Sequence, residues 1–197
     1  MKTKKQEELV NSFLSLLGDE IRPLYHDIVM YMSELGYHPK KEKSSISFKH
    51  DLHNKQMAKM GFKRNKGNPP FFALRFSACR GYSHRFDDIV GAAVAKPSFH
   101  EAQCMNNCCN YCAGEADTHV YTYISPDGKI ELHCGAYALE IPDITADDIG
   151  EIKRLIKEEH EYLLKHEVGI STILRPSKSI KGENICLHFQ NFQWLSI

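Results

Sequence analysis

The stretch HVYTYISPDGKIELHCG, residues 119–135, predicts a β-hairpin and decides the class of fold. Two runs that alternate apolar and polar residues flank Ser125–Gly128, and the Ser-Pro-Asp-Gly sequence between them favours a tight turn. A third apolar run, AYALEIP at 136–142, extends the pattern. The chain therefore contains antiparallel strands that are joined locally.

Strand alternation predicts which side chains of the second run share a face. Ile130, Leu132 and Cys134 fall on one face, and Glu131 and His133 fall on the other. The more apolar face is expected to point inward, which makes Cys134 the better candidate than His133 for a buried site. A bulge at the following glycine would reverse this facing.

Helical periodicity lies on both sides of the hairpin. After it, residues 146–166 carry apolar side chains at three- and four-residue spacing, and Thr145 with Asp148 has the spacing of a capping box. Before it, residues 5–17 and 19–35 predict two antiparallel helices, and 84–95 predict another. The predicted strands are 44–50, 70–79, 119–125 and 129–141. Residues 50–62 are ambiguous and favour a short helical turn around Met57 and Met60.

These elements predict an α+β fold. An antiparallel sheet of about four to five strands is expected to pack against an N-terminal helical hairpin and a long C-terminal helix. The expected organisation is a single domain over 1–167 with a cysteine-rich insert at 97–118. The remaining 168–197 form a tail whose segment ICLHFQ alternates like an edge strand and is expected to dock on the domain or on a second subunit.

The insert contains the segment CMNNCCNYC, which holds four of the seven cysteines of the chain. Thiolates at two- to four-residue spacing suit a tetrahedral zinc ion when another ligand comes from elsewhere in the fold. The hairpin offers that ligand, so a structural zinc is the expected cofactor. Either Cys104 or Cys108 would complete the site. The candidate metal ligands are Cys104, Cys108, Cys109, Cys112 and Cys134. Two alternatives are buried cysteines without chemistry and a redox-active thiol pair.

The formal net charge is zero, but the basic and acidic residues are unevenly distributed along the chain. Residues 36–85 contain twelve basic and two acidic side chains, whereas 86–197 contain nine basic and seventeen acidic ones. Such asymmetry can mark a surface for an anionic ligand or a nucleic acid, for which Lys63, Arg64, Lys66 and Arg75 are the candidates. The alternative is that the charges of the two halves intermingle on a solvated surface.

The sequence also limits the class of function. It contains no G-x-S-x-G, no glycine-rich phosphate loop and no H-E-x-x-H. Neither a signal peptide nor an apolar run of roughly 20 residues is present, which predicts a cytoplasmic protein without a membrane partner. The leading hypothesis is a zinc-stabilised binding or regulatory module for an unknown small molecule or protein. The alternatives are a thiol- or zinc-dependent enzyme, and an anion or nucleic-acid binder.

The stretches YTYISPDGKIELHCG and EIPDITADDIGEIKRLIKEEHEYL resemble a bacterial cytosolic protein family with a cysteine-rich centre, a PDG hairpin and a terminal amphipathic helix. The resemblance covers residues 40 to 166. It implies a fold and a domain extent, and it implies no function.

Overall fold

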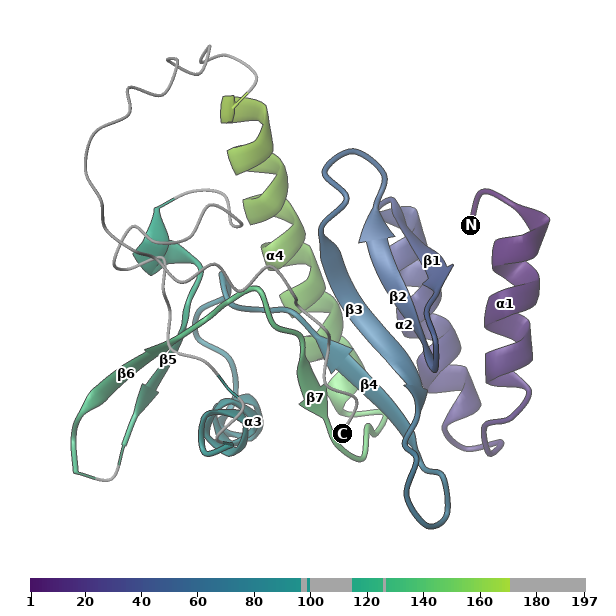
Figure 1. Ribbon diagram of the computed structural model, residues 1–197, viewed down its shortest axis with the longest axis horizontal. Coiled ribbons are helices and arrows are strands. Elements are labelled where there is room, and N and C mark those ends of the chain that lie inside the picture. The colour runs from purple at the N-terminus through teal and green to yellow at the C-terminus, as the bar shows by residue number, and fades with distance from the viewer. Residues whose placement is uncertain (97–98, 100–114, 126, 171–197) are drawn as a thin grey trace.

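The computed structural model describes residues 1–96, 99, 115–125 and 127–170, and it has the predicted α+β architecture (Figure 1). The helices are α1 (Lys4–Leu14), α2 (Arg22–Glu34), α3 (His84–Val94) and α4 (Asp148–Ile170), with a short 3₁₀ helix η2 (Ala116–Thr118). The strands are β1 (Tyr37–Lys41), β2 (Ser45–His50), β3 (Gln56–Phe62), β4 (Pro70–Leu74), β5 (Tyr121–Ile124), β6 (Ile130–His133) and β7 (Leu139–Ile141).

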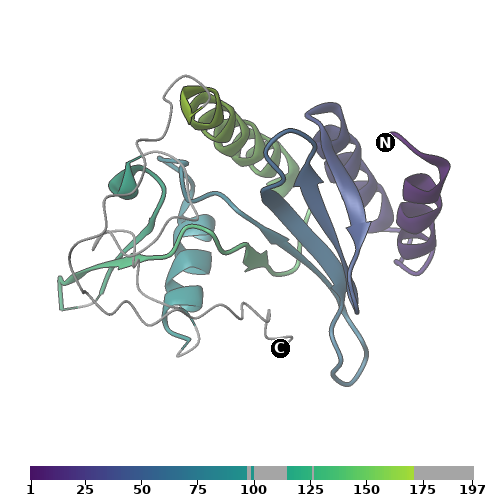
Figure 2. The ribbon, with the colours of Figure 1, turned by 45° about the horizontal axis from the view of Figure 1, so that its top comes forward.

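The main sheet has five antiparallel strands in the order β1-β2-β3-β4-β7. One cross-strand row, Ile46, Met60, Phe72 and Ile141, is buried throughout. Helices α2 and α4 lie side by side against one face of the sheet, with α1 beside them at the β1 edge (Figures 1 and 2). The contact between the rings of Tyr25 on α2 and Phe72 on β4 shows that the apolar row faces these helices.

The helix termini follow from local sequence. Helix α1 begins with a capping box, in which the Thr3 hydroxyl accepts from the Gln6 amide and the Gln6 side chain accepts from the Thr3 amide. Of the capping box predicted at Thr145, the structure has the half that Asp148 supplies, because the Asp148 carboxylate accepts from both the amide and the hydroxyl of Thr145. The helix itself begins at Asp148 rather than at 146, and it extends to Ile170.

Three predictions of secondary structure were wrong. Residues 56–62 form strand β3, not a helical turn, and β1 was not predicted because Pro39 interrupts its sequence signal. Since β1 is an edge strand, a proline there does not disrupt the ladder. The predicted strand 129–141 is divided between two sheets: β6 pairs with β5, whereas β7 pairs with β4 in the main sheet. Pairing partners are set by the whole fold, which local alternation does not encode.

The hairpin of β5 and β6 is a separate two-stranded sheet that extends away from the main sheet beside α3 (Figure 1). Its link to the body is Tyr121, whose buried hydroxyl accepts from the Phe76 amide at 3.0 Å and donates to the Tyr137 carbonyl at 2.9 Å. Tyr123 packs against Gly91 of α3. Among the described residues, these contacts to the body come from one face of the hairpin, the face that carries Tyr121 and Tyr123.

Most of the predicted C-terminal tail lies outside the described residues. The predicted tail begins at Val168, within the last turn of α4, and residues 171–197 lie outside the described residues.

Within 1–96 and 115–170, no helix combines the length and the apolar character that a bilayer crossing requires.

Candidate metal centre at the base of the β5–β6 hairpin

The cysteine-rich insert leaves and rejoins the described chain at the base of the β5–β6 hairpin. Cys104, Cys108, Cys109 and Cys112 lie outside the described residues. On the N-terminal side of the insert, the ring of Phe99 lies 5.3 Å from that of His133 and 5.4 Å from that of Tyr137. Near its C-terminal end, the carbonyl of Glu115 accepts from His119 Nδ1 at 2.9 Å. The described residues on both sides of the segment that contains the four insert cysteines, Phe99 and Glu115, therefore lie at this base.

His119 has the arrangement typical of a histidine that binds a metal. Its Nδ1 donates to the Glu115 carbonyl and lies 3.1 Å from the hydroxyl of Tyr162 on α4. Its Nε2 is buried and has no hydrogen-bond partner among the described residues. Burial lowers the pKa of this imidazole, which favours the neutral form that carries a free electron pair. Metal-binding histidines usually donate their other ring nitrogen to a carbonyl or a carboxylate in this way.

His133 repeats the arrangement on β6. Its Nε2 lies 3.3 Å from the Glu131 carboxylate, and its Nδ1 is buried without a hydrogen-bond partner in the part of the chain that the structure describes. An imidazole oriented by a carboxylate is a common outer-sphere pattern at zinc sites. His119 and His133 are thus two buried imidazoles, each with one nitrogen oriented and one nitrogen available.

Cys134 follows β6 directly and is half-buried. It lies close enough to Tyr137 to raise the pKa of that hydroxyl, although burial is the larger cause. Phe99 contacts the same tyrosine. Cys134 is therefore located where the insert leaves the described chain.

The predicted facing of β6 was wrong. His133 is 5% exposed, whereas Ile130 on the face that was expected to be inside is 63% exposed. The inward face of the hairpin is set by Tyr121, which pairs with His133, and by Tyr123 against α3. Cys134 lies beyond the last paired residue of the strand, so alternation does not determine its orientation.

The absence of a side chain at Gly135 allows close packing between Gly135, His119 and Ser77 at the hairpin base. A Cβ atom at Gly135 would lie 1.7 Å from the His119 carbonyl oxygen and 2.5 Å from Ser77 Oγ. The Ser77 hydroxyl donates to the Gly135 carbonyl at 2.9 Å. Only a residue without a side chain permits this approach between the hairpin and the segment after β4.

Within the described part of the chain, no group of three or more histidine, cysteine, aspartate or glutamate side chains is gathered closely enough to hold a metal ion. A complete tetrahedral site at the hairpin base would therefore need ligands from 104–112. The sequence pattern favoured Cys134 over His133 as the metal ligand from the hairpin, and it did not indicate His119. The available signal was the position of His119, seven residues after Cys112.

The predicted basic surface needs correction. Arg75 is 1% exposed, and its Nε lies 2.6 Å from the Glu159 carboxylate of α4. Lys63 pairs with Glu140 at 2.5 Å. Of the four candidates, Arg64 and Lys66 are exposed, in the loop between β3 and β4. The positive charge of Arg75 is buried and paired with Glu159, so these four residues do not form one anion-binding surface.

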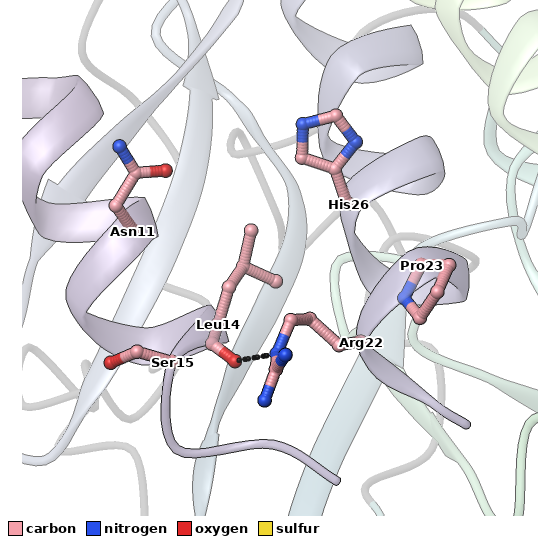
Figure 3. A pocket seen from close by; sticks show the side chains of 6 residues that line it. All are labelled: Asn11, Leu14, Ser15, Arg22, Pro23 and His26. Atoms are coloured by element: carbon pink, nitrogen blue, oxygen red, sulfur yellow. Dashed lines mark hydrogen bonds between the residues drawn. The ribbon is translucent and has the colours of Figure 1, made fainter. Parts of the chain in front are cut away.

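A groove of about 470 Å³ lies between α1 and α2 (Figure 3). Its central polar group is Arg22, which donates to the carbonyls of Leu14 and Leu17 at the end of α1. This arginine also pairs with Asp19 at 2.9 Å. Its donors therefore stabilise a helix end, and none of the predicted metal ligands lines the groove.

Comparison with models of protein families, with curated proteins and with solved structures found no match. The chemistry of the chain's own residues therefore carries the functional assignment.

Proposed function

We propose that this protein is a cytoplasmic, zinc-stabilised binding or regulatory module in which a structural zinc ion joins the cysteine-rich insert to the base of the β5–β6 hairpin. The proposed ligands are Cys109 and Cys112, with either Cys104 or Cys108, and Cys134. A tetrahedral zinc ion takes four ligands, so each buried imidazole of His119 and His133 that binds the metal would replace one of the thiolates of Cys104, Cys108 and Cys134 in a mixed cysteine and histidine site.

The observation that carries the proposal is the pair of buried imidazoles beside the insert. Leaving a buried ring nitrogen without a partner costs free energy, about 1–3 kcal/mol per polar group. A metal ion would satisfy both nitrogens and would recover that cost. The reducing cytoplasm that we propose would keep the cysteines available as thiolate ligands.

The experiment is metal analysis of the purified full-length protein together with a thiol titration. We expect about one zinc per chain, and a lower melting temperature after chelation, because metal binding contributes directly to folding. Cys109→Ser and Cys112→Ser should lose the metal. Cys79→Ala is the matched control, since the Cys79 sulfur is buried and donates to the Leu155 carbonyl. Metal-free protein whose insert thiols all react freely contradicts the proposal.

Substitution of cobalt for zinc can distinguish thiolate ligands from imidazole ligands, because the intensity of the sulfur-to-cobalt absorption reports the number of thiolates bound to the metal. Cys134→Ser should weaken this absorption if the sulfur is a ligand. His133→Asn and His119→Asn should preserve it while lowering metal affinity if an imidazole is a ligand. Four protein ligands would identify a structural metal, whereas three ligands and an exchangeable water would favour the zinc-enzyme alternative.

A further inference from the structure

Three histidines that are distinct from those of the hairpin base gather at one end of the main sheet. The ring of His50 on β2 stacks on that of His53 at 4.3 Å with an interplanar angle of 11°. His160 of α4 lies 5.5 Å from His50. Tyr37 of β1 contacts all three rings, and its hydroxyl lies 3.3 Å from His160 Nδ1.

The hydrogen bonds define the protonation state of two of these rings. The amide of Leu52 donates to His50 Nδ1 at 3.2 Å, and the amide of Lys55 donates to His53 Nδ1 at 3.1 Å. A ring nitrogen that accepts from an N–H must carry its electron pair. Both imidazoles therefore close the turn in the neutral form. A proton added at either Nδ1 would place two N–H groups against each other.

The described groups around His50 and His160 compensate added charge only in part: Asp51 and the backbone of Leu35 favour the charged form of His50, but burial opposes it more strongly. Asp51 is the acid of the turn, and its carboxylate is already paired with Lys2 of the N-terminal segment and with His38 of β1. Lys40 of β1 donates to Asn54 in the same turn. On α4, Glu161 favours the charged form of His160, but the neighbouring His50 opposes it.

Burial is the largest influence on the pKa values of His38, His50 and His160. It lowers the pKa values of His38, His50 and His160, and the charge of Asp51 only partly opposes this effect at His38 and His50. The Arg75–Glu159 pair also acts on Tyr37. Burial is the main cause of the raised pKa of the Tyr37 hydroxyl, the charge of Glu159 raises this pKa further, and the charge of Arg75 lowers it by less. Two imidazolium rings stacked at 4.3 Å would also repel each other.

We propose that the turn Asp51–Lys55, here named the histidine turn, is a proton-operated switch: neutral His50 and His53 hold it closed against Tyr37 and His160, and protonation releases it while the rest of the sheet stays paired. The turn carries Leu52, which is 84% exposed, so its release changes how an apolar side chain is presented. This switch is independent of the proposed zinc site.

The test is amide hydrogen exchange by NMR on the full-length protein at pH 7.5 and pH 5.5, corrected for intrinsic exchange. We expect the Leu52 and Lys55 amides to lose protection by about tenfold or more, the change that one pH unit gives a single-proton equilibrium. The Met60 amide in β3 should lose no more protection than the fall in the free energy of unfolding over the same pH range accounts for. Equal protection of Leu52 at both pH values overturns the proposal, and so does a free energy of opening at Leu52 equal to that at Met60, which would report global unfolding.

Two variants separate the accepted hydrogen bond from ring packing. His53→Phe keeps an aromatic ring on His50 but removes the acceptor and the charge. The Lys55 amide should then be weakly protected at both pH values, and Leu52 should keep its pH dependence. His26→Gln, on the exposed face of α2, is the matched control and should leave both profiles unchanged. A persistent pH response of Lys55 in His53→Phe would contradict the assigned role of His53.

Discussion

At the scale of single residues, the hairpin base depends on the absence of one side chain. Gly135 approaches the backbone of His119 more closely than any Cβ atom allows, and the obstructing atom is a carbonyl oxygen that has little freedom to move. The same contact holds the candidate ligands Cys134 and His119 near each other in the fold. A substitution here tests both packing and the candidate site.

We predict that Gly135→Ala lowers the free energy of unfolding by about 3 kcal/mol or more, because the added methyl group forces the hairpin away from the segment after β4. Urea denaturation measures the effect. Gly150→Ala is the matched control, since a Cβ at this exposed position in α4 meets nothing within 4 Å. It should be neutral or stabilising by up to about 1 kcal/mol. Equal behaviour of the two variants would contradict the close approach.

At the scale of elements, a buried ion pair links the end of β4 to α4. Arg75 Nε lies 2.6 Å from one oxygen of Glu159, and the Ala78 amide donates to the other oxygen at 2.8 Å. Both side chains are almost fully buried. Removing one partner would leave a buried charge without compensation, whereas removing both would leave mainly the unsatisfied amide.

We predict that Arg75→Met destabilises the protein by about 3–5 kcal/mol, and that Arg75→Met combined with Glu159→Leu costs less than the sum of the two single substitutions. A double-mutant cycle in urea measures the coupling. Lys157→Met breaks a pair in which both side chains are about 60% exposed, and it should cost less than about 1 kcal/mol. Additive effects of the Arg75 and Glu159 substitutions would show that the pair does not act as a unit.

At the scale of the whole molecule, several buried histidines make stability depend on pH. The pKa values of His38, His50 and His160 are lower in the folded state than in an unfolded chain, chiefly because of burial. The unfolded state therefore binds more protons as the pH falls through the ordinary histidine range. Stability is full above about pH 7, and it is lost progressively from about pH 6.5 downward.

We predict that the urea midpoint falls between pH 7.5 and pH 5.5, with a loss of about 1 kcal/mol or more per pH unit. The measurement is equilibrium unfolding at several pH values with constant ionic strength. His160→Phe should reduce the slope, since it removes one of these titrating groups while keeping a ring beside Tyr37. A midpoint that is constant or that rises on acidification would contradict the assigned direction of these pKa shifts.

The described core also predicts how the molecule tolerates shortening. The buried apolar cluster extends from Val10 to Leu163, so the packing of the sheet and its helices precedes the tail. A chain that ends after Glu167 should therefore keep its fold, its zinc and its cooperative unfolding, with altered solubility or oligomeric state. Circular dichroism, metal analysis and light scattering check this. Failure to fold would show that the tail belongs to the core.

Local chemistry made the helices and the hairpin predictable from the sequence. Apolar spacing along α2 and α4, the cap at Thr145 and the turn residues between β5 and β6 act over a few positions, so a short window of sequence contains them. The same locality limited the prediction of the site. The clustering of cysteines was visible, but the buried nitrogens of His119 and His133 depend on contacts with α4, α3 and Phe99.

The sequence by itself determined the α+β class, the positions of the four helices and the thiol-rich composition of the insert, because periodicity, capping and composition are properties of neighbouring residues. Tertiary structure alone decided the rest. It separated β6 from β7, turned His133 inward, and paired Arg75 with a glutamate 84 positions away. It also stacked His50 on His53 against a helix that lies far along the chain. These outcomes depend on which surfaces exclude water together, and that is settled only when distant segments pack.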